Sequence, residues 1–109
     1  MLVRDKNAIP PVVRADGVAM TDLLGGEIPA GAGVTMGYAV FPPGTVVPPA
    51  AHTGDEYSFI LSGTVKCEAG GVVHTASAGM ATFIPAGETH SSFNDGAAEA
   101  ALVWMLVEK

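Results

Sequence analysis

Basic residues are scarce in this sequence. Five lysines and arginines stand against eleven aspartates and glutamates, which gives a net charge of −6 at pH 7. A protein that binds nucleic acid needs a patch of positive charge to neutralise the phosphates, and this chain has no basic cluster. We therefore expect no nucleic-acid partner.

Long apolar runs are missing as well. The longest uninterrupted run covers residues 100–107, whereas a membrane-spanning helix needs about 20 apolar residues. Near the start of the chain, Arg4, Asp5 and Lys6 lie where a secretory signal peptide would have its apolar centre. We expect no membrane span and a cytoplasmic protein.

Cysteine occurs once, at Cys67, so no internal disulfide can form. This usage fits a reducing compartment such as the cytoplasm. In an extended chain Cys67 shares a face with Val65 and Ala69, and we interpret it as a small buried apolar residue and not as a reactive thiolate.

The remaining composition is typical of a sheet-rich chain with many turns. Hydrophobic residues make up 49% and charged residues 15%, and fourteen glycines and eight prolines separate short apolar runs. A chain of 109 residues can build one core but not two. We predict a single all-β domain over residues 1–109, in which residues 1–11 form an extended N-terminal arm that ends in Pro10 and Pro11.

Alternation and turn signals predict the strands. Residues 34–41 alternate cleanly, with Met36, Tyr38 and Val40 on one face. A hairpin is predicted from residues 12–14 and 18–24, a loop over residues 25–33, and further strands over residues 55–61, 64–69, 72–76, 80–84, 89–94 and 102–107. Such spacing is typical of an antiparallel sandwich or barrel. Residues 45–49 are excluded from a central ladder because Pro48 and Pro49 lack the amide donor.

Two segments carry the residue types of a metal site. In residues 44–63, Ala50, His52 and Glu56 share one face of an extended chain, and Gly54 allows a bend between the last two. In residues 79–94, His90 offers a third ligand. Imidazole nitrogens and a carboxylate suit a divalent Fe, Mn, Ni, Co or Zn ion, and we predict one such ion bound by His52, Glu56 and His90.

The same segments resemble the two motifs of the cupin family, G-x5-H-x-H-x(3 or 4)-E-x6-G and G-x5-P-x-G-x2-H-x3-N. The second motif is met at every fixed position, namely Gly79, Pro85, Gly87, His90 and Asn94. The first is met at Gly44, His52, Glu56 and Gly63, and it fails where Ala50 replaces the first histidine. The resemblance implies a double-stranded β-helix, a jelly-roll β-barrel, in which His52, Glu56 and His90 bind a metal and the fourth ligand is absent.

The resemblance leaves the activity open, because cupin barrels host dioxygenases, isomerases, decarboxylases, lyases and plain binding modules. Two histidines and a carboxylate match the composition of the facial triad of non-haem Fe(II) oxygenases. The leading hypothesis is a small metal-binding cupin that binds or acts on a small polar organic molecule, with dioxygenase-like chemistry as one form of it. The alternative is a non-catalytic small-molecule-binding or sensor cupin with weak or no metal.

Three further residues have candidate roles, and a fourth, His74, has none. If the face of Tyr38 lines the barrel, its hydroxyl is a candidate proton donor in catalysis. Ser92 and Asn94 share a face with His90, where they can line the pocket or orient a ligand histidine. His74 matches no motif position and is expected to be exposed or singly hydrogen-bonded.

The resemblance also implies a homodimer, since cupins often pair through sheet edges or N-terminal arms, and an unpaired edge strand on so apolar a chain needs cover. The expected partners are therefore a second copy of the chain and a small-molecule ligand or substrate.

Overall fold

The fold is described here from a computed structural model that covers residues 1–25 and 33–108. Nine strands form in these residues, each within two residues of its predicted range: β1 (Val12–Val13), β2 (Ala19–Leu24), β3 (Val34–Phe41), β4 (Asp55–Ser62), β5 (Thr64–Ala69), β6 (Val72–Ser77), β7 (Ala81–Ile84), β8 (His90–Phe93) and β9 (Ala100–Val107). The predicted loop over residues 25–33 lies, apart from its two end residues, outside the described part of the chain.

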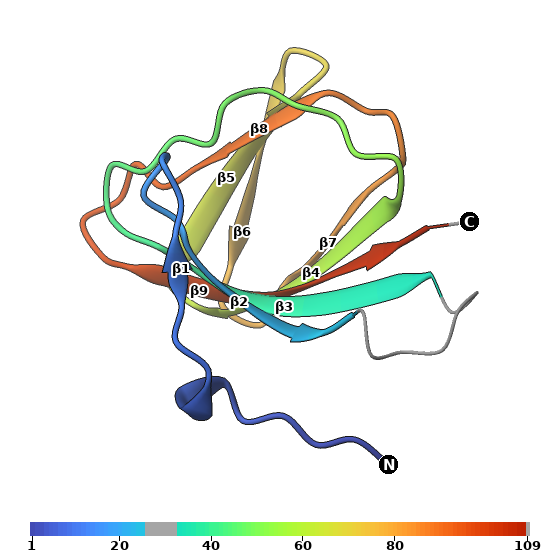
Figure 1. The fold of residues 1–109 in the computed structure, drawn as a ribbon. Helices are drawn as coiled ribbons and strands as arrows, with labels where there is room; N and C mark the ends of the chain where they lie inside the picture. The colour runs from blue at the N-terminus through green and yellow to red at the C-terminus, as the bar shows by residue number, and fades with distance from the viewer. Residues whose placement is uncertain (26–32, 109) are drawn as a thin grey trace.

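The strands form two sheets that face each other (Figure 1). A six-stranded sheet has the order β1-β2-β3-β9-β4-β7, and a three-stranded sheet has the order β6-β5-β8. Neighbouring strands in both sheets run antiparallel. This is the jelly-roll barrel predicted from the sequence.

The N-terminal arm leaves the barrel below the six-stranded sheet (Figure 1). It holds one element that the sequence did not predict, the 3-10 turn η1 (Lys6–Ala8). Asp5 caps this turn, because its side chain accepts a hydrogen bond of 2.9 Å from the backbone N–H of Asn7. Within the described residues, no helix is long and apolar enough to cross a membrane.

The segment between β3 and β4 runs beside β8 although it is not itself a regular strand. Isolated bridges pair Val46 with Phe93 and Ala50 with His90. Pro48 and Pro49 lie between these two bridges and cannot donate to a ladder, so the pairing is interrupted there, as predicted. This segment therefore extends the three-stranded sheet and sets Ala50 against His90.

The inward faces of both sheets supply the core. Strand alternation turns Ala39 and Phe41 of β3 inward, where they join Ile60 of β4 and Leu102 of β9 in one buried apolar cluster. On β9, Trp104 lies directly opposite Gly37 of β3. A Cβ atom added at Gly37 would collide with the indole ring, so the glycine makes room for the tryptophan on the inner wall.

Asn94 ties three segments of the chain together. It is 2% exposed, and its side-chain N–H groups donate to the carbonyls of Phe41 and Ala98, each at 2.9 Å. Its side-chain oxygen accepts a 3.0 Å hydrogen bond from the backbone N–H of Gly96. The role expected for Asn94 beside a ligand histidine is thus replaced by a structural one.

Replacing Asn94 with alanine should lower the free energy of unfolding by about 3 kcal/mol, because three hydrogen bonds are lost and the buried carbonyl of Phe41 loses this donor. Urea unfolding followed by circular dichroism measures this loss. The matched control is Asn7→Ala, which removes an exposed asparagine from the arm and should cost almost nothing. Equal effects of the two substitutions would contradict the structural role of Asn94.

Candidate metal centre

The loop that carries His52 and Glu56 is held against the end of β9. Gly54 is buried there, and an added Cβ atom would lie 2.9 Å from the backbone carbonyl oxygen of Val107. The hydroxyl of Thr53 donates to the carboxylate of Glu108, 2.8 Å from its nearer oxygen. At the predicted bend, Gly54 therefore allows its backbone to approach that of β9 closely. The bend turns Glu56 back toward His52.

A second loop, residues 85–88, fastens the first loop from the other side. The backbone N–H of Gly87 donates to the carbonyl of His52 at 2.8 Å, and that of Ala86 donates to the side chain of Asp55 at 2.9 Å. Gly87 has a φ of 83°, a conformation that favours glycine. Backbone hydrogen bonding thus joins the two cupin-like motifs and places His52 near His90.

His90 has a defined orientation and a defined tautomer. Its side chain points inward from β8, and the residue is 7% exposed. Its Nδ1 atom lies 2.9 Å from the carbonyl oxygen of Glu88. A carbonyl can only accept, so Nδ1 carries the proton and the lone pair resides on Nε2. This is the arrangement in which a histidine is held ready to bind a metal.

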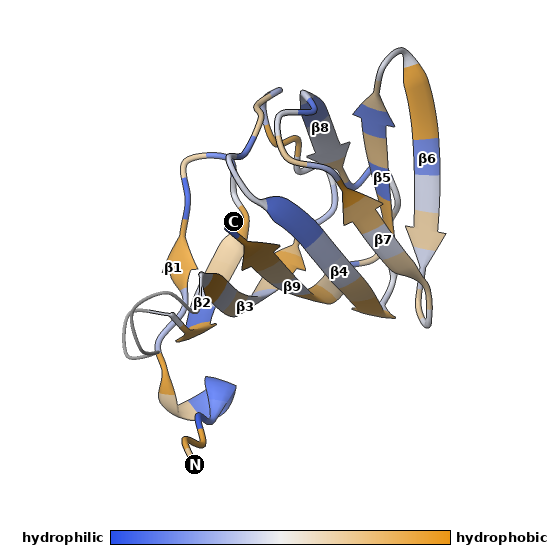
Figure 2. Ribbon diagram, turned by 90° about the vertical axis from the view of Figure 1, so that its right-hand side faces the viewer, coloured by the Kyte–Doolittle hydropathy of each residue, from blue (hydrophilic) through white to orange (hydrophobic). Residues whose placement is uncertain are grey.

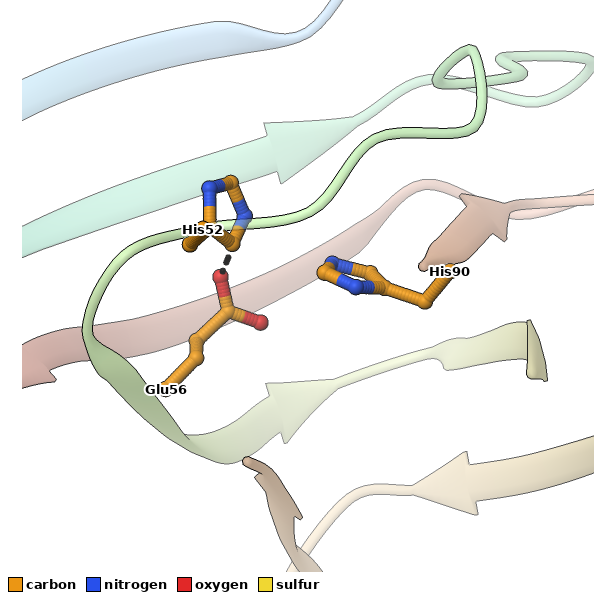
Figure 3. Close-up of side chains that lie close together, drawn as sticks. All are labelled: His52, Glu56 and His90. Carbon is orange, nitrogen blue, oxygen red and sulfur yellow. Dashed lines mark ion pairs between the residues drawn. The ribbon is translucent and has the colours of Figure 1, made fainter. Parts of the chain in front are cut away.

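The side chains of His52, Glu56 and His90 converge (Figure 3). Nε2 of His52 lies 3.4 Å from Oε1 of Glu56, and the two imidazole ring centroids are 5.1 Å apart with an angle of 59° between the ring planes. One ligand atom from each residue can be chosen so that all three lie within 4.8 Å of one another. Ligands about 2.1 Å from a shared ion lie roughly 3.0–3.4 Å apart, so the three residues fit one divalent metal after a small side-chain rotation.

Ala50 occupies the position next to this triad where the motif has its first histidine. Its backbone N–H donates to the carbonyl of His90 and its carbonyl accepts from the N–H of His90, both at 3.0 Å. Residues paired in this way project their side chains to the same side of the sheet. The methyl group of Ala50 therefore leaves one side of the metal position without a protein ligand.

The triad lies at a cavity of about 510 Å³ between the two sheets. Three residues that face each other across strands β6, β5 and β8 line it next to the triad, namely His74, Cys67 and Ser92. Burial raises the pKa of the Cys67 thiol, and a hydrogen bond with Ser92 opposes this only in part. Cys67 is half-buried on the cavity wall, and His74 is exposed as expected but faces the cavity side of its strand.

Tyr38 lies elsewhere, so the condition for its candidate role, that its face of the strand lines the barrel, is not met. The inward positions of β3 are those of Ala39 and Phe41, so alternation turns Tyr38 to the outer face of the sheet. There it borders a separate pocket beside the N-terminal arm, and the Lys6 ammonium lies 4.7 Å from the centre of its ring. This position does not support a role as proton donor in the cavity.

Sequence reasoning missed two features of the site. The carbonyl of Glu88 fixes the tautomer of His90, and its only sequence signal was its place two residues before the histidine. Trp104 lines the cavity, and among the described residues no group accepts a hydrogen bond from its buried Nε1. The strand over residues 102–107 was predicted, but which of its faces is inward follows only from the register with β3 and β4.

Comparison with known proteins agrees with this fold. A family model described as "Cupin domain" matches residues 37–106. The structure of a predicted oxalate decarboxylase from Thermotoga maritima is similar at a TM-score of 0.89 and 24% identity, covering 99% of this chain and 100% of that one. A Cupin 2 conserved barrel domain protein from Salinispora arenicola gives a TM-score of 0.82 at 16% identity, covering 99% of this chain and 89% of that one.

A third solved structure, that of KdgF from Halomonas sp., gives a TM-score of 0.81 at 14% identity and covers 100% of this chain and 96% of that one. No curated protein matches the chain. Because the family model covers well over half of the sequence, the chain belongs to the cupin family. The likenesses to solved structures establish the fold alone.

Replacing Ala50 with histidine should add the fourth ligand and lower the Kd for a divalent metal. We expect a change of at least the ~10-fold that the loss of an outer ligand partner typically costs, measured by competition with a chromophoric chelator. The matched control is Ala51→His, whose side chain alternates to the opposite side of the chain. Equal gains from both substitutions, or none from Ala50→His, would contradict the orientation assigned to Ala50.

Proposed function

We propose that this protein is a small metal-dependent cupin that binds an organic molecule in its barrel and acts on it at one divalent metal. The observation that carries the proposal is the convergence of His52, Glu56 and His90 beside a cavity of about 510 Å³. A cavity of this size lies within the range of pockets that hold small molecules. Two imidazoles and one carboxylate, with an open side at Ala50, match the donor set of the dioxygenase-like facial triad.

The residues of the chain have distinct roles in this proposal. When bound, a divalent metal supplies a Lewis acid that polarises a coordinated oxygen atom. The carbonyl of Glu88 keeps His90 in the tautomer that ligates, because it accepts the Nδ1 proton at 2.9 Å. Glu88 also lines the cavity, so its carboxylate is available to accept or return a proton there.

The alternative is a non-catalytic binding or sensor module. It is favoured by the absent ligand at Ala50 and by the partial exposure of His52, whose side chain is 38% accessible. Both features weaken metal retention, and a domain without metal keeps the same cavity. Metal content distinguishes the two functions, because the enzyme requires stoichiometric metal.

Protein prepared without an affinity tag and loaded with Fe(II), Mn(II) or Zn(II) should retain one metal ion per chain, as measured by elemental analysis. Glu56→Gln and His90→Ala should each lower retention at least ~10-fold, because each removes a ligand. The control is His74→Ala, which removes a histidine of the cavity wall that lies outside the triad. Absence of retained metal in the unmodified protein would overturn the metal-dependent function and leave the binding module.

We also propose that the protein forms a homodimer through the outer face of its six-stranded sheet. Five large apolar side chains on β4, β7 and β9 are 36–54% exposed, namely Tyr57, Phe59, Leu61, Phe83 and Met105. The rings of Tyr57 and Phe83 pack against each other with centroids 5.0 Å apart. In the described part of the chain, the outward positions of β3, β7 and β9 carry no charged side chain.

The size of this face is what favours a second copy of the chain as its partner. A fully buried aromatic side chain covers about 150–250 Å², so three half-exposed rings alone offer about 300 Å². Monomeric proteins rarely leave more than a few hundred Å² of continuous apolar surface open, and a stable dimer buries about 800 Å² on each partner. The N-terminal arm below this sheet adds Leu2 and Val3, which are also exposed.

Light scattering after gel filtration at micromolar concentration should give twice the chain mass of 11.0 kDa. Phe59→Lys should reduce the mass to that of one chain, because a charge would be buried in the interface. The control is Val73→Lys on β6, since Val73 is exposed to a similar degree but belongs to the other sheet. A monomer mass for the unmodified protein, or a dimer that survives Phe59→Lys, would contradict this interface.

A further inference from the structure

We infer that the ligand of this site is amphipathic, with a metal-chelating oxygen head group and an uncharged, mainly apolar body that extends down the barrel. The inference rests on the proposed function, because the head group is placed at the metal. It replaces the small polar molecule expected from the sequence with a more specific class. The observation behind it is the change in polarity from the triad to the floor of the cavity.

The register of the sheets sorts the cavity wall into three layers. The layer of the triad contains Glu56 on β4, opposite Leu106 on β9, and His90 on β8, opposite Ala69 on β5. Two residues further along each strand, the side chains point inward again and form the next layer. Successive layers are therefore about 7 Å apart along a strand.

The middle layer contains no carboxylate, lysine or arginine. It is made by the pair Ser58 and Trp104 on the six-stranded sheet and by the row His74, Cys67 and Ser92 on the three-stranded sheet, where His74 is exposed on the edge strand β6. Hydroxyl groups, a thiol, an indole N–H and an exposed imidazole offer single hydrogen bonds, but none of them is a permanent charge that balances a second charge on the ligand. A ligand body that passes this layer is therefore neutral.

The bottom layer is apolar. It is made by buried side chains from both sheets, namely Ile60, Leu102, Ala39, Val65 and Ala76. Figure 2 shows the same change along β4, which is hydrophilic where it begins beside the triad and hydrophobic toward its other end. This layer forms the floor of the cavity, because its side chains pack against each other in the core cluster.

The charged groups of the wall support the same conclusion. Glu56 and Glu88 lie in or next to the triad layer, so they repel a second carboxylate on the ligand. Arg14 is the only lysine or arginine among the described residues of the wall, and its guanidinium is already paired with Asp16. The cavity thus offers the metal as its one strong anion-binding group.

The depth of the cavity sets the expected length of the ligand. One layer spacing of about 7 Å separates the triad from the middle layer. An extended chain advances roughly 1.2 Å per bond, so a linear body of about six bonds reaches from the head group to the middle layer, and one of about twelve bonds reaches the floor one layer further on. A single aromatic ring with a short linker also reaches the middle layer.

Zn(II)-loaded protein titrated with straight-chain hydroxamates, from acetohydroxamate to tetradecanohydroxamate, tests this inference. Trp104 is the only tryptophan of the chain and lies in the middle layer, so its fluorescence reports the passage of an apolar body. Affinity should rise about fourfold for each added methylene until the chain reaches the floor, and then stop rising. The Trp104 emission should shift to shorter wavelength over the same range.

Two variants of β4 separate cavity filling from non-specific apolar binding. Ser58→Phe places a ring in the middle layer and should remove the dependence on chain length while acetohydroxamate still binds. Ser62→Phe, at the exposed end of the same strand, should leave the series unchanged. A matched decanol titration shows whether an apolar chain without the head group is held.

The outcomes distinguish the two proposals. Metal-dependent binding of acetohydroxamate with no gain from longer chains, or tighter binding of oxalate than of hexanoate, would overturn the amphipathic ligand and leave the metal function in place. Binding of long hydroxamates and decanol that is equally strong without Zn(II) would overturn the metal function and leave the apolar cavity. Steep chain-length dependence that requires Zn(II) and is lost in Ser58→Phe supports both.

Discussion

The paired backbone hydrogen bonds between Ala50 and His90 are the constraint on which the rest of the site depends. They join the segment before β4 to β8 at 3.0 Å in both directions, across 40 residues of chain. The hydrogen bond from Gly87 to the carbonyl of His52 fastens the same two segments one step further on. With both backbones fixed in this way, only short side-chain movements separate His52, Glu56 and His90 from a shared metal ion.

The same constraint explains how the barrel can be apolar inside and polar at the triad. The two histidines of the triad come from the loop and strand end that meet at this bridge, and Glu56 follows where β4 begins. The strands then continue into the interior, where Ile60 and Leu102 are packed in the core. Stability and binding are thus supplied by different stretches of the same strands, which allows the cavity to stay open beside a well-packed floor.

Much of this could be predicted from the sequence, because local signals agree with the fold. The alternation of residues 34–41 and the turns at Gly63, Gly70 and Gly71 gave strands that the structure confirms, and these glycines adopt positive φ. The motif spacing brought His52, Glu56 and His90 together in prediction, and the structure places them within reach of one ion.

Other features could not be predicted, because they depend on which face of a strand is inward. Alternation groups Tyr38 with Met36 and Val40, but it does not say which group faces the barrel, and the structure turns Tyr38 outward. The hydrogen bonds donated by the Asn94 side chain depend on the carbonyls of Phe41 and Ala98, and Phe41 is 53 residues away in the sequence. The carbonyl of Glu88 that orients His90 belongs to the backbone, so the residue type at position 88 does not indicate this contact.

The central claim is that His52, Glu56 and His90 share one metal ion with an open side at Ala50. Anomalous diffraction at the metal absorption edge, from crystals of protein loaded with Fe(II) or Zn(II), tests this most directly. We expect one anomalous peak, about 2.0–2.2 Å from Nε2 of His90, a ring nitrogen of His52 and a carboxylate oxygen of Glu56, with water or ligand on the side of Ala50. A peak at other side chains, or none between these three, would contradict it.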